Sequence, residues 1–517
     1  MFGDLFSTAD TASQLALCPD TEFKGVLFEG LEFFKESLEI KSMIEADIDA
    51  WALRKKQQRL EDKRWESARM TGLPLGDLPA ISGEDALQLQ SGRPRLLDGE
   101  SVFVLLLARG YYGSLSSCQA VDRMLDSMLI NAYFSSRNQP MPSHNCALDN
   151  LNAVNNQTRD HIFRAQLSYI KKKSLDEFDL LSIDSFSVEA NTCWPTDSSI
   201  ILSLLNRVWH CGQKLKDFDL PGFTPGCVEQ WLKQLKKIDF EMNCIGGKPG
   251  AAKKLRKLYR QYLNIAVKSI NRLAGQLEVL TVKWEALNIV PSRQRQAEAI
   301  MEIVNDDLAA AGRVCGYTGD RVFNDIVLPS TEKILSISDP CAAFIKKGGR
   351  DPKIGYKPQV ARSGNGFITA FELEQGNPAD SARLLPVTRQ HQRNTGITPD
   401  VVTVDDGYSS KAGRDELLKE IPTVSISGSK GRKITSAEQW NSELYASARN
   451  MRSAVESLVF TLRYKFSMYR FSRRGIEAVK GEMTEKMIVH NFWRIGVIKR
   501  KLEMENLASR PPAKKAA

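Results

Sequence analysis

The spacing of apolar positions changes several times along this chain and outlines its elements. Residues 30–70 repeat apolar side chains at roughly helical spacing, and short helices with tight turns are expected over residues 91–170. Residues 175–186 form the first strong strand, whereas residues 197–310 return to a helical pattern almost throughout. From Glu332 the spacing becomes that of strands. This order predicts a mixed α/β sheet with helices on both faces, interrupted after its first strand by a helical insertion.

Turn and capping residues define the elements after Glu332. The Ser-Gly-Asn-Gly segment at residues 363–366 has the composition of a hairpin turn. Thr435 and Glu438 have the spacing of a capping box, which predicts one long helix from there to about Phe466. Strands are expected at residues 333–337, 354–360, 367–373, 400–404 and 423–426, and helices at residues 379–390, 414–419 and 473–505.

The part before the sheet is expected to be helical. A linker rich in Gly, Pro, Leu and Asp at residues 71–90 follows a charged helical arm. Ser116 and Ser143 precede helical segments and are predicted to cap them, the second helix beginning near Cys146. Short helices joined by tight turns suit a helix-turn-helix DNA-binding domain and suit a plain helical bundle equally well.

Composition places the chain among soluble globular proteins, with 42% hydrophobic and 26% charged residues. Its longest apolar stretch, at residues 102–108, is too short to cross a bilayer, and its start lacks the basic region of a signal peptide. A cytoplasmic protein is therefore expected. The nine cysteines include no Cys-x-x-Cys pair, which suits reduced thiols. A zinc site is not expected, because the spacing of one group fits no known finger: His210, Cys211, Cys227 and Cys244.

The net charge of +9 comes from one end of the chain. Residues 451–517 contain 15 Lys and Arg against 6 Glu, so the rest of the chain is neutral on balance. A local basic surface is the electrostatic footprint for a polyanion, most often nucleic acid. A solvated helix face would give the same count, so charge alone leaves both interpretations open.

Two acidic residues follow apolar strands. Asp184 ends the strand at residues 175–186, and Asp405 follows a β-branched run at residues 401–404 that is typical of a strand buried on both faces. Open α/β sheets bind ligands outside the carboxyl ends of their strands. Two acids on adjacent central strands repel each other unless a cation lies between them. Each Asp alone would be a cap or turn residue, but the pair favours a metal site.

A third acid is expected on one of the last helices. Glu456 lies beside the apolar stripe of residues 455–462, with Arg452 one turn before it and Arg463 two turns after. An exposed ion pair between Arg452 and Glu456 explains the same spacing. Glu477, on the following helix, is a rival, so spacing alone does not decide the third acid.

The ordered set of these residues matches a known family. The matching features, in chain order, are a Gly-Arg-Pro opening at residues 92–94, the block Asp184, Glu189, Asn191, Trp194, Pro195, Thr196, Asp197 and Ser198, the segment from Gly376 to Asp380, the segment from Asp405 to Tyr408, and the set Arg452, Glu456 and Arg463. From about Ser91 to its last helix, the chain resembles the DDE transposases of bacterial insertion sequences.

The resemblance implies a ribonuclease-H-like mixed sheet with a helical insertion, preceded by an all-helical N-terminal domain. The expected domains are a helical arm and linker at residues 1–90, a helical DNA-binding domain at 91–174, the catalytic domain at 175–196 and 331–505, the helical insertion at 197–330, and a disordered basic tail at 506–517.

The resemblance also implies a metal-dependent reaction. Asp184, Asp405 and Glu456 would be the catalytic acids and would hold two Mg²⁺ ions, for which Mn²⁺ can substitute. Water on one ion would cut a phosphodiester at the element's end, and the freed 3′-hydroxyl would attack target DNA. The residues implied to shape the site or orient the insertion are Glu189, Asn191, Thr196 and Asp197.

Residues 405 and 406 are both Asp. The family's Asp-x-Gly-Tyr spacing, which ends at Tyr408, implies that Asp405 is the catalytic acid. A basic loop follows the strand at residues 423–426, near the edge that carries the acids. The residues predicted to contact the scissile DNA backbone are Lys430, Arg432, Lys433, Arg452 and Arg463.

The leading hypothesis is therefore a transposase acting on double-stranded DNA at element ends and target sites, as a homodimer or larger assembly in the bacterial cytoplasm. A metal-dependent nuclease without strand transfer is the enzymatic alternative. A DNA-binding protein whose catalytic site has decayed is the third, and Phe186, which stands where the family has a small hydroxyl residue, slightly favours it.

Overall fold

The computed structural model forms two compact units, which are described separately. One unit contains Met1–Trp51, Pro94–Asn191 and Cys341–Ala517, and the other contains Ala52–Arg93 and Thr192–Pro340. Described residues are 20–71, 96–113, 116–192, 194, 196–218, 220, 222–224, 226–285, 291–346 and 351–508. Nearly all of the predicted linker, the Gly-Arg-Pro opening and residues 509–517 of the predicted basic tail lie outside them.

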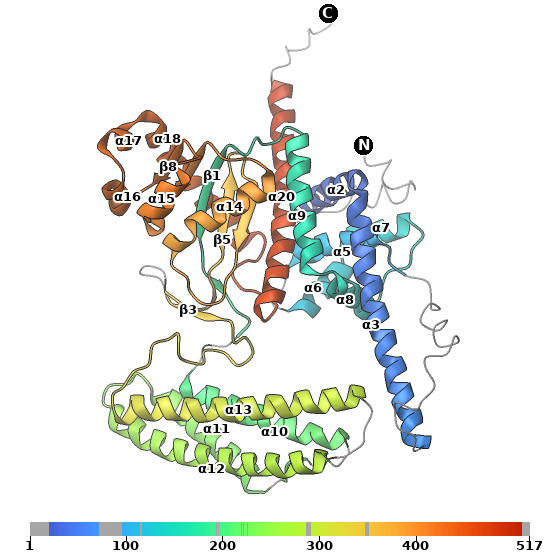
Figure 1. The fold of residues 1–517 in the computed structure, drawn as a ribbon, viewed down its shortest axis with the longest axis vertical. Coiled ribbons are helices and arrows are strands. Elements are labelled where there is room, and N and C mark those ends of the chain that lie inside the picture. The colour runs from blue at the N-terminus through green and yellow to red at the C-terminus, as the bar shows by residue number, and fades with distance from the viewer. Residues whose placement is uncertain are drawn as a thin grey trace, which may run out of the picture. The chain divides into compact units, whose positions relative to one another are not determined.

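The first unit contains a five-stranded mixed sheet with the order β6-β5-β1-β7-β8 (Figure 1). Its strands are β1 (Leu180–Ser185), β5 (Gln359–Ser363), β6 (Ile368–Glu372), β7 (Val401–Val404) and β8 (Thr423–Ile426). β1 pairs antiparallel with β5 and parallel with β7, and β7 pairs parallel with β8. The predicted mixed α/β sheet is confirmed, and the segment 192–340 indeed separates β1 from its partners.

An aliphatic core covers one face of this sheet. Alternate residues of the central strands, such as Ile183 and Val404, pack with Leu384 and Val387 of α14 (Leu384–Thr395). Burying each such side chain stabilises the fold by about 1.5–3 kcal/mol. α15 (Lys411–Leu417) contributes Leu417 to the same core. The central strands are therefore rigid supports for whatever their ends carry.

A second, three-stranded sheet has the order β2-β4-β3, made by β2 (Val188–Glu189), β3 (Ala343–Ile345) and β4 (Lys353–Tyr356). Two strand predictions were wrong here. Residues 333–337 form turns and irregular backbone. The single strand predicted at residues 354–360 is divided between β4 and β5 at Lys357 and Pro358, because proline has no N–H to donate to a ladder.

Hairpin and capping predictions are confirmed at three places. β5 and β6 form an antiparallel hairpin, whose turn has the Gly366 N–H bonded to the Ser363 carbonyl at 3.0 Å. Ser116 caps α6 (Ser117–Leu125) and Ser143 caps α8 (His144–Ala153). The other helices before β1 are α2 (Thr21–Glu36), α3 (Leu38–Thr71), α5 (Gly99–Tyr112), α7 (Met128–Ser136) and α9 (Asn156–Lys172).

The long helix predicted from Thr435 to Phe466 is in fact three helices, α17 (Ala437–Asn441), α18 (Glu443–Met451) and α19 (Ser453–Tyr464). Thr435 donates to the Gly431 carbonyl instead of capping, and Ser436 caps α17. Ser442 then starts α18 by accepting the Tyr445 N–H at 3.3 Å. Local serine caps thus compete with one continuous helix. The helix predicted at residues 379–390 begins with a short 3₁₀ turn, η3 (Asp380–Ala382).

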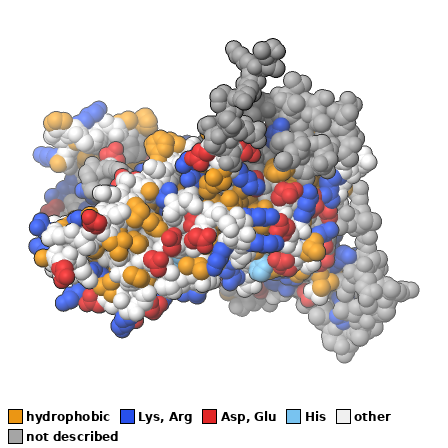
Figure 2. Space-filling model, turned by 90° about the horizontal axis from the view of Figure 1, so that it is seen from above, with side chains coloured by type: hydrophobic (Ala, Val, Ile, Leu, Met, Phe, Trp, Pro, Cys, Tyr) orange, Lys and Arg blue, Asp and Glu red, His pale blue; other side chains and the backbone are white. Residues whose placement is uncertain are grey.

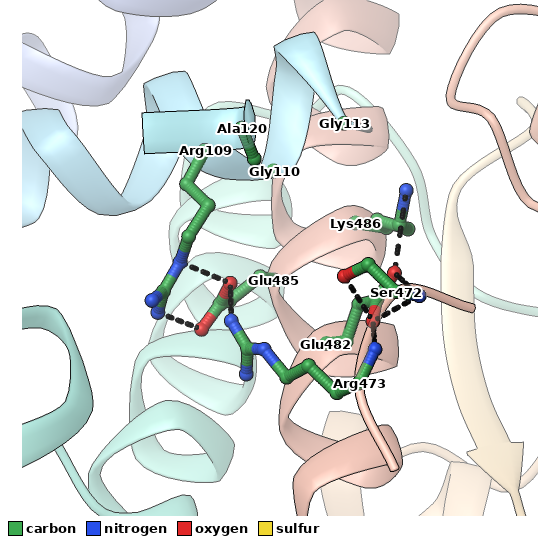
Figure 3. A pocket seen from close by; sticks show the side chains of 9 residues that line it. All are labelled: Arg109, Gly110, Gly113, Ala120, Ser472, Arg473, Glu482, Glu485 and Lys486. Carbon is green, nitrogen blue, oxygen red and sulfur yellow. Dashed lines mark hydrogen bonds and ion pairs between the residues drawn. The ribbon is translucent and has the colours of Figure 1, made fainter. Parts of the chain in front are cut away.

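The last helix, α20 (Ile476–Ala508), packs against α2, α5 and α9 (Figure 1). A buried ion cluster lies at this contact. Glu485 accepts hydrogen bonds from Arg109 at 2.6 Å and from Arg473 at 2.7 Å (Figure 3). It also accepts one from Arg159 at 2.8 Å. Burial raises the pKa of Glu485, but the three guanidinium charges outweigh burial and hold that pKa well below its usual range.

Several cations of the basic C-terminal segment are therefore internal. Arg473 binds Glu485, and the buried Lys486 ammonium donates to the Phe466 carbonyl at 2.7 Å. On the face seen in Figure 2, Lys and Arg side chains lie among Asp and Glu side chains. The sequence count of basic residues consequently overstates the basic surface.

The second unit contains α10 (Asp197–Lys214), η2 (Leu215–Phe218), α11 (Cys227–Ile245), α12 (Ala252–Glu285) and α13 (Pro291–Phe323). These helices share a large apolar core, and Arg207 of α10 forms an ion pair with the buried Asp307 of α13. Most of the described residues between 197 and 310 are helical, as predicted. No helix in the described ranges is both long enough and apolar enough to span a membrane.

Candidate active site

Asp184 and Asp405 lie at the same edge of the main sheet. β1 and β7 run parallel, and Ile183 of β1 lies opposite Val404 of β7. Asp184 and Asp405 are the residues that directly follow these two. Both side chains are half-buried. The structure therefore brings these two predicted residues together at the carboxyl ends of adjacent central strands, where open α/β sheets bind ligands.

The two acids of the Asp405-Asp406 pair point to different partners. Asp405 accepts the Gly407 N–H at 2.9 Å at the start of η4 (Asp406–Tyr408). Asp406 accepts the N–H groups of Lys430 and Gly431, each at 2.9 Å, at the N-terminus of α16 (Ser429–Ile434). Asp406 is thus occupied as a helix cap, and Asp405 is the acid at the sheet edge.

A polar network that the sequence pattern did not reveal lies beside the pair. Asp380 accepts hydrogen bonds from Gln359 at 2.8 Å and from Lys357 at 3.0 Å. Gln359 in turn accepts one from the hydroxyl of the buried Tyr408. The sequence pattern could not show this network, because it depends on the antiparallel pairing of β5 with β1, which places Gln359 opposite Ser185, the residue after Asp184.

Negative charge is concentrated around Tyr408. Burial raises the pKa of this phenol far above its usual value, and the charges of Asp380, Asp184 and Asp405 raise it further. Burial also acts to raise the pKa of Asp380, but hydrogen bonds from Gln359, Lys357 and Ser185 outweigh it and keep that pKa below its usual range. Asp380 is therefore a fixed carboxylate anion at this edge.

Glu456 does not join the pair in this structure. Its side chain on α19 is 56% exposed and bonds to Arg452 at 2.7 Å, an (i, i+4) ion pair of the kind the spacing also allowed. Within the described ranges, no three His, Cys, Asp or Glu side chains converge closely enough to hold a metal ion. The rival Glu477 is also exposed and bonds to Asn156 and Lys480.

Arg463 lies at the end of β1. It donates to the Ser187 carbonyl at 3.0 Å, and its guanidinium lies 5.8 Å from the centre of the Phe186 ring. Phe186, the departure from the family pattern, is therefore a buried contact of this arginine. The predicted basic loop is the short helix α16, on which Lys430, Arg432 and Lys433 are exposed.

The other predicted residues hold the surrounding backbone. Glu189 pairs with Lys353 at 2.8 Å, and Asn191 donates to the Ser472 carbonyl at 2.8 Å. In the helical unit, Thr196 forms the capping box of α10 and Asp197 pairs with Arg321 at 2.9 Å. These four residues fix the two ends of the segment that leaves the sheet.

Residues 336–492 match the family model of the transposase DDE domain. The chain carries a DDE transposase domain. The match supports transposition, a form of DNA recombination, as the activity of this domain. The matched segment contains Asp405 and Glu456. Asp184 precedes this segment in the sequence, and the pairing of β1 with β7 places it at the same sheet edge as Asp405. No curated protein and no solved structure matches the chain.

The donors at the DDE domain's sheet edge fit a hard divalent cation. Asp184 and Asp405 offer carboxylate oxygens, and no sulfur or imidazole ligand accompanies them in the network described above. Mg²⁺ usually keeps several waters and is bound through one or two carboxylates together with substrate phosphates. Two acids at one sheet edge, Asp184 and Asp405, suit such an ion.

Proposed function

We propose that this protein is a transposase that cuts DNA at the ends of a mobile element and joins those ends to target DNA. One observation carries the proposal. In a chain with a DDE domain, Asp184 and Asp405 directly follow Ile183 and Val404, which pair with each other in the parallel strands β1 and β7. The order of antiparallel β6, β5 and β1 followed by parallel β7 and β8 supports a ribonuclease-H-like catalytic domain.

Asp184 and Asp405 would hold Mg²⁺, or Mn²⁺ in its place, with Glu456 as the third acid. Two such ions, when bound, activate water and stabilise the charge that develops on phosphate oxygens. Glu456 is paired with Arg452 here, and DNA phosphates compete for that arginine, which would free the carboxylate. Its assignment rests on the family's Arg, Glu and basic-residue spacing.

The remaining residues position DNA and backbone. Exposed Lys430, Arg432 and Lys433 would contact the scissile backbone, because Asp406 fixes their helix beside Asp405. Arg463 would stiffen the end of β1 through Ser187. The N-terminal helices would bind the element's ends, and joining two ends would require a dimer or larger assembly on DNA.

A strand-transfer assay tests the proposal. The full chain is incubated with Mg²⁺, a target plasmid and a DNA fragment bearing the sequences that flank its own reading frame. Joined products that disappear in Asp184→Asn and Asp405→Asn support a transposase. Cleavage without joining would indicate a nuclease instead, and binding without cleavage a decayed enzyme. Asp415→Asn, an exposed acid on α15, is the matched control and should retain joining.

A further inference from the structure

Asp380 reaches the candidate active site from a segment separate from both proposed acids. Its turn, η3, contacts η4, which directly follows Asp405. A methyl group on Gly407 would lie 3.0 Å from Asp405 Oδ1 and 3.4 Å from Asp380 Oδ2. Both carboxylates therefore approach the same side of Gly407, close enough for their charges to act on the same cation.

The two oxygens of Asp380 have different environments. Oδ1 receives both the Gln359 amide at 2.8 Å and the Lys357 ammonium at 3.0 Å. Oδ2 is the oxygen that approaches Gly407. One oxygen is thus anchored by two donors, and the other is held in a fixed direction at the Asp405 side.

The anchors are themselves fixed. Gln359 pairs with Ser185 across β5 and β1 and also accepts the buried Tyr408 hydroxyl. Lys357 donates to the Pro378 carbonyl at 2.9 Å, so its ammonium is held from two directions. Its side chain is 11% exposed. This network holds Asp380 in place before any ligand arrives.

Three carboxylates near one buried phenol repel one another, and Lys357 supplies one positive charge against them. We propose that Asp380 is a positioning residue of the cation site: it adds negative charge and orients ion-bound water, while Asp184 and Asp405 bind directly. This inference rests on the proposed function. With ion-bound water between Asp380 and the cation, the site would need only Asp184 and Asp405 as direct carboxylate ligands.

Mn²⁺ binding to the full chain without DNA, followed by the electron paramagnetic resonance signal of free Mn²⁺, tests this inference. Asp380→Asn should weaken binding about 10- to 100-fold, the range found for residues that orient metal ligands. Lys357→Gln keeps the carboxylate and removes its competing cation, so binding should stay equal or tighten. A purely structural ion pair would make both variants lose affinity alike, and that result would overturn the inference.

Further variants separate this inference from the proposed function. Asp415→Asn should leave Mn²⁺ affinity without DNA unchanged, because its carboxylate is exposed on α15 and belongs neither to the acid pair nor to the Asp380 network. Gly407→Ala keeps every carboxylate and should still weaken Mn²⁺ binding, because the added methyl group would crowd Asp405 and Asp380. This variant tests the inference if Asp380→Asn proves too unstable to measure. Unchanged affinity in Asp380→Asn rejects the inference alone. Unchanged affinity in Asp184→Asn and Asp405→Asn rejects the metal site of the proposed function.

Discussion

The Arg109 guanidinium and the Glu485 carboxylate form two hydrogen bonds, at 3.0 Å and 2.6 Å, with their side chains only 4% and 1% exposed. The bond joins α5 to the last helix of the chain. Arg159 and Arg473 bind the same carboxylate, so three cations depend on one anion. The N-terminal helices are thereby attached to the segment that follows the candidate active site.

Glu485→Gln should lower the free energy of unfolding by about 3–5 kcal/mol, because removing one partner of a buried ion pair leaves the others uncompensated. Urea denaturation followed by circular dichroism measures this loss. Glu477→Gln on the same helix is the control, since that side chain is 70% exposed, and should change stability by less than about 0.5 kcal/mol. Similar small losses in both variants would show that the cluster contributes little.

Stability should also fall as pH decreases from about 6.5 to 4. Burial lowers the pKa of His391 to about 4 and that of His490 to about 3, so both are neutral when folded over this range. The unfolded chain binds their protons near pH 6.5, and it therefore gains protons first as pH falls. The His391 shift corresponds to about 3 kcal/mol.

Urea midpoints at pH 7, 5.5 and 4 measure this dependence. His391→Gln removes one of the two titrations and should flatten the curve, although it lowers stability at pH 7 by disturbing the contact with Thr369 at 2.7 Å. A slope that is the same in wild type and variant would contradict the assignment to His391.

Asp405 and Asp406 should behave differently although they are neighbours. Asp406→Ala removes the acceptor at the N-terminus of α16, which typically costs about 1 kcal/mol. Hydrogen exchange should then show faster exchange of the Lys430 and Gly431 amides. Asp405→Ala should leave these two amides protected and abolish DNA cleavage. Equal loss of amide protection in both variants would contradict the separation of roles.

The exposed cations of α16 should account for part of the salt dependence of DNA binding. Replacing Lys430, Arg432 and Lys433 with Ala should reduce the slope of log K against log salt by roughly 0.9 for each DNA phosphate that these side chains neutralise. A control replaces three exposed lysines of α11 with Ala, which changes net charge equally: Lys233, Lys236 and Lys237. An unchanged slope in the α16 variant would refute its contact with the backbone.

Much of the fold could be predicted from local patterns. The β-branched run at β7 and the serine caps of α6 and α8 act through neighbouring residues, so the sequence displays them directly. The break between α18 and α19 could not be predicted, because no side chain caps the start of α19 and the two helices pack against different strands, α18 against β7 and β8 and α19 against β1. Residues 333–337 have strand-like composition but no pairing partner in the described sheets.

The candidate site was predictable only in part, for a physical reason. Asp184 and Asp405 could be placed together because each ends or follows an apolar strand, and open α/β sheets bind ligands outside the carboxyl ends of their strands. Asp380 was expected only as the end of the matching segment from Gly376, and its contact with Gln359 could not be predicted because it depends on the place where β5 begins, directly after Pro358. The spacing around Glu456 suits both a third catalytic acid and an exposed ion pair with Arg452, and this structure shows the ion pair.

The separation of β1 from its partner strands has a consequence during synthesis of the chain. Asp405 follows Asp184 by 221 residues, so at 5–20 residues per second about 10–40 s pass before β7 is made. The helices at residues 192–340 share an apolar core of their own and can fold during that time. β1 must wait with its apolar side chains uncovered, and a nascent or truncated chain ending before β7 has no acid pair with which to cut DNA.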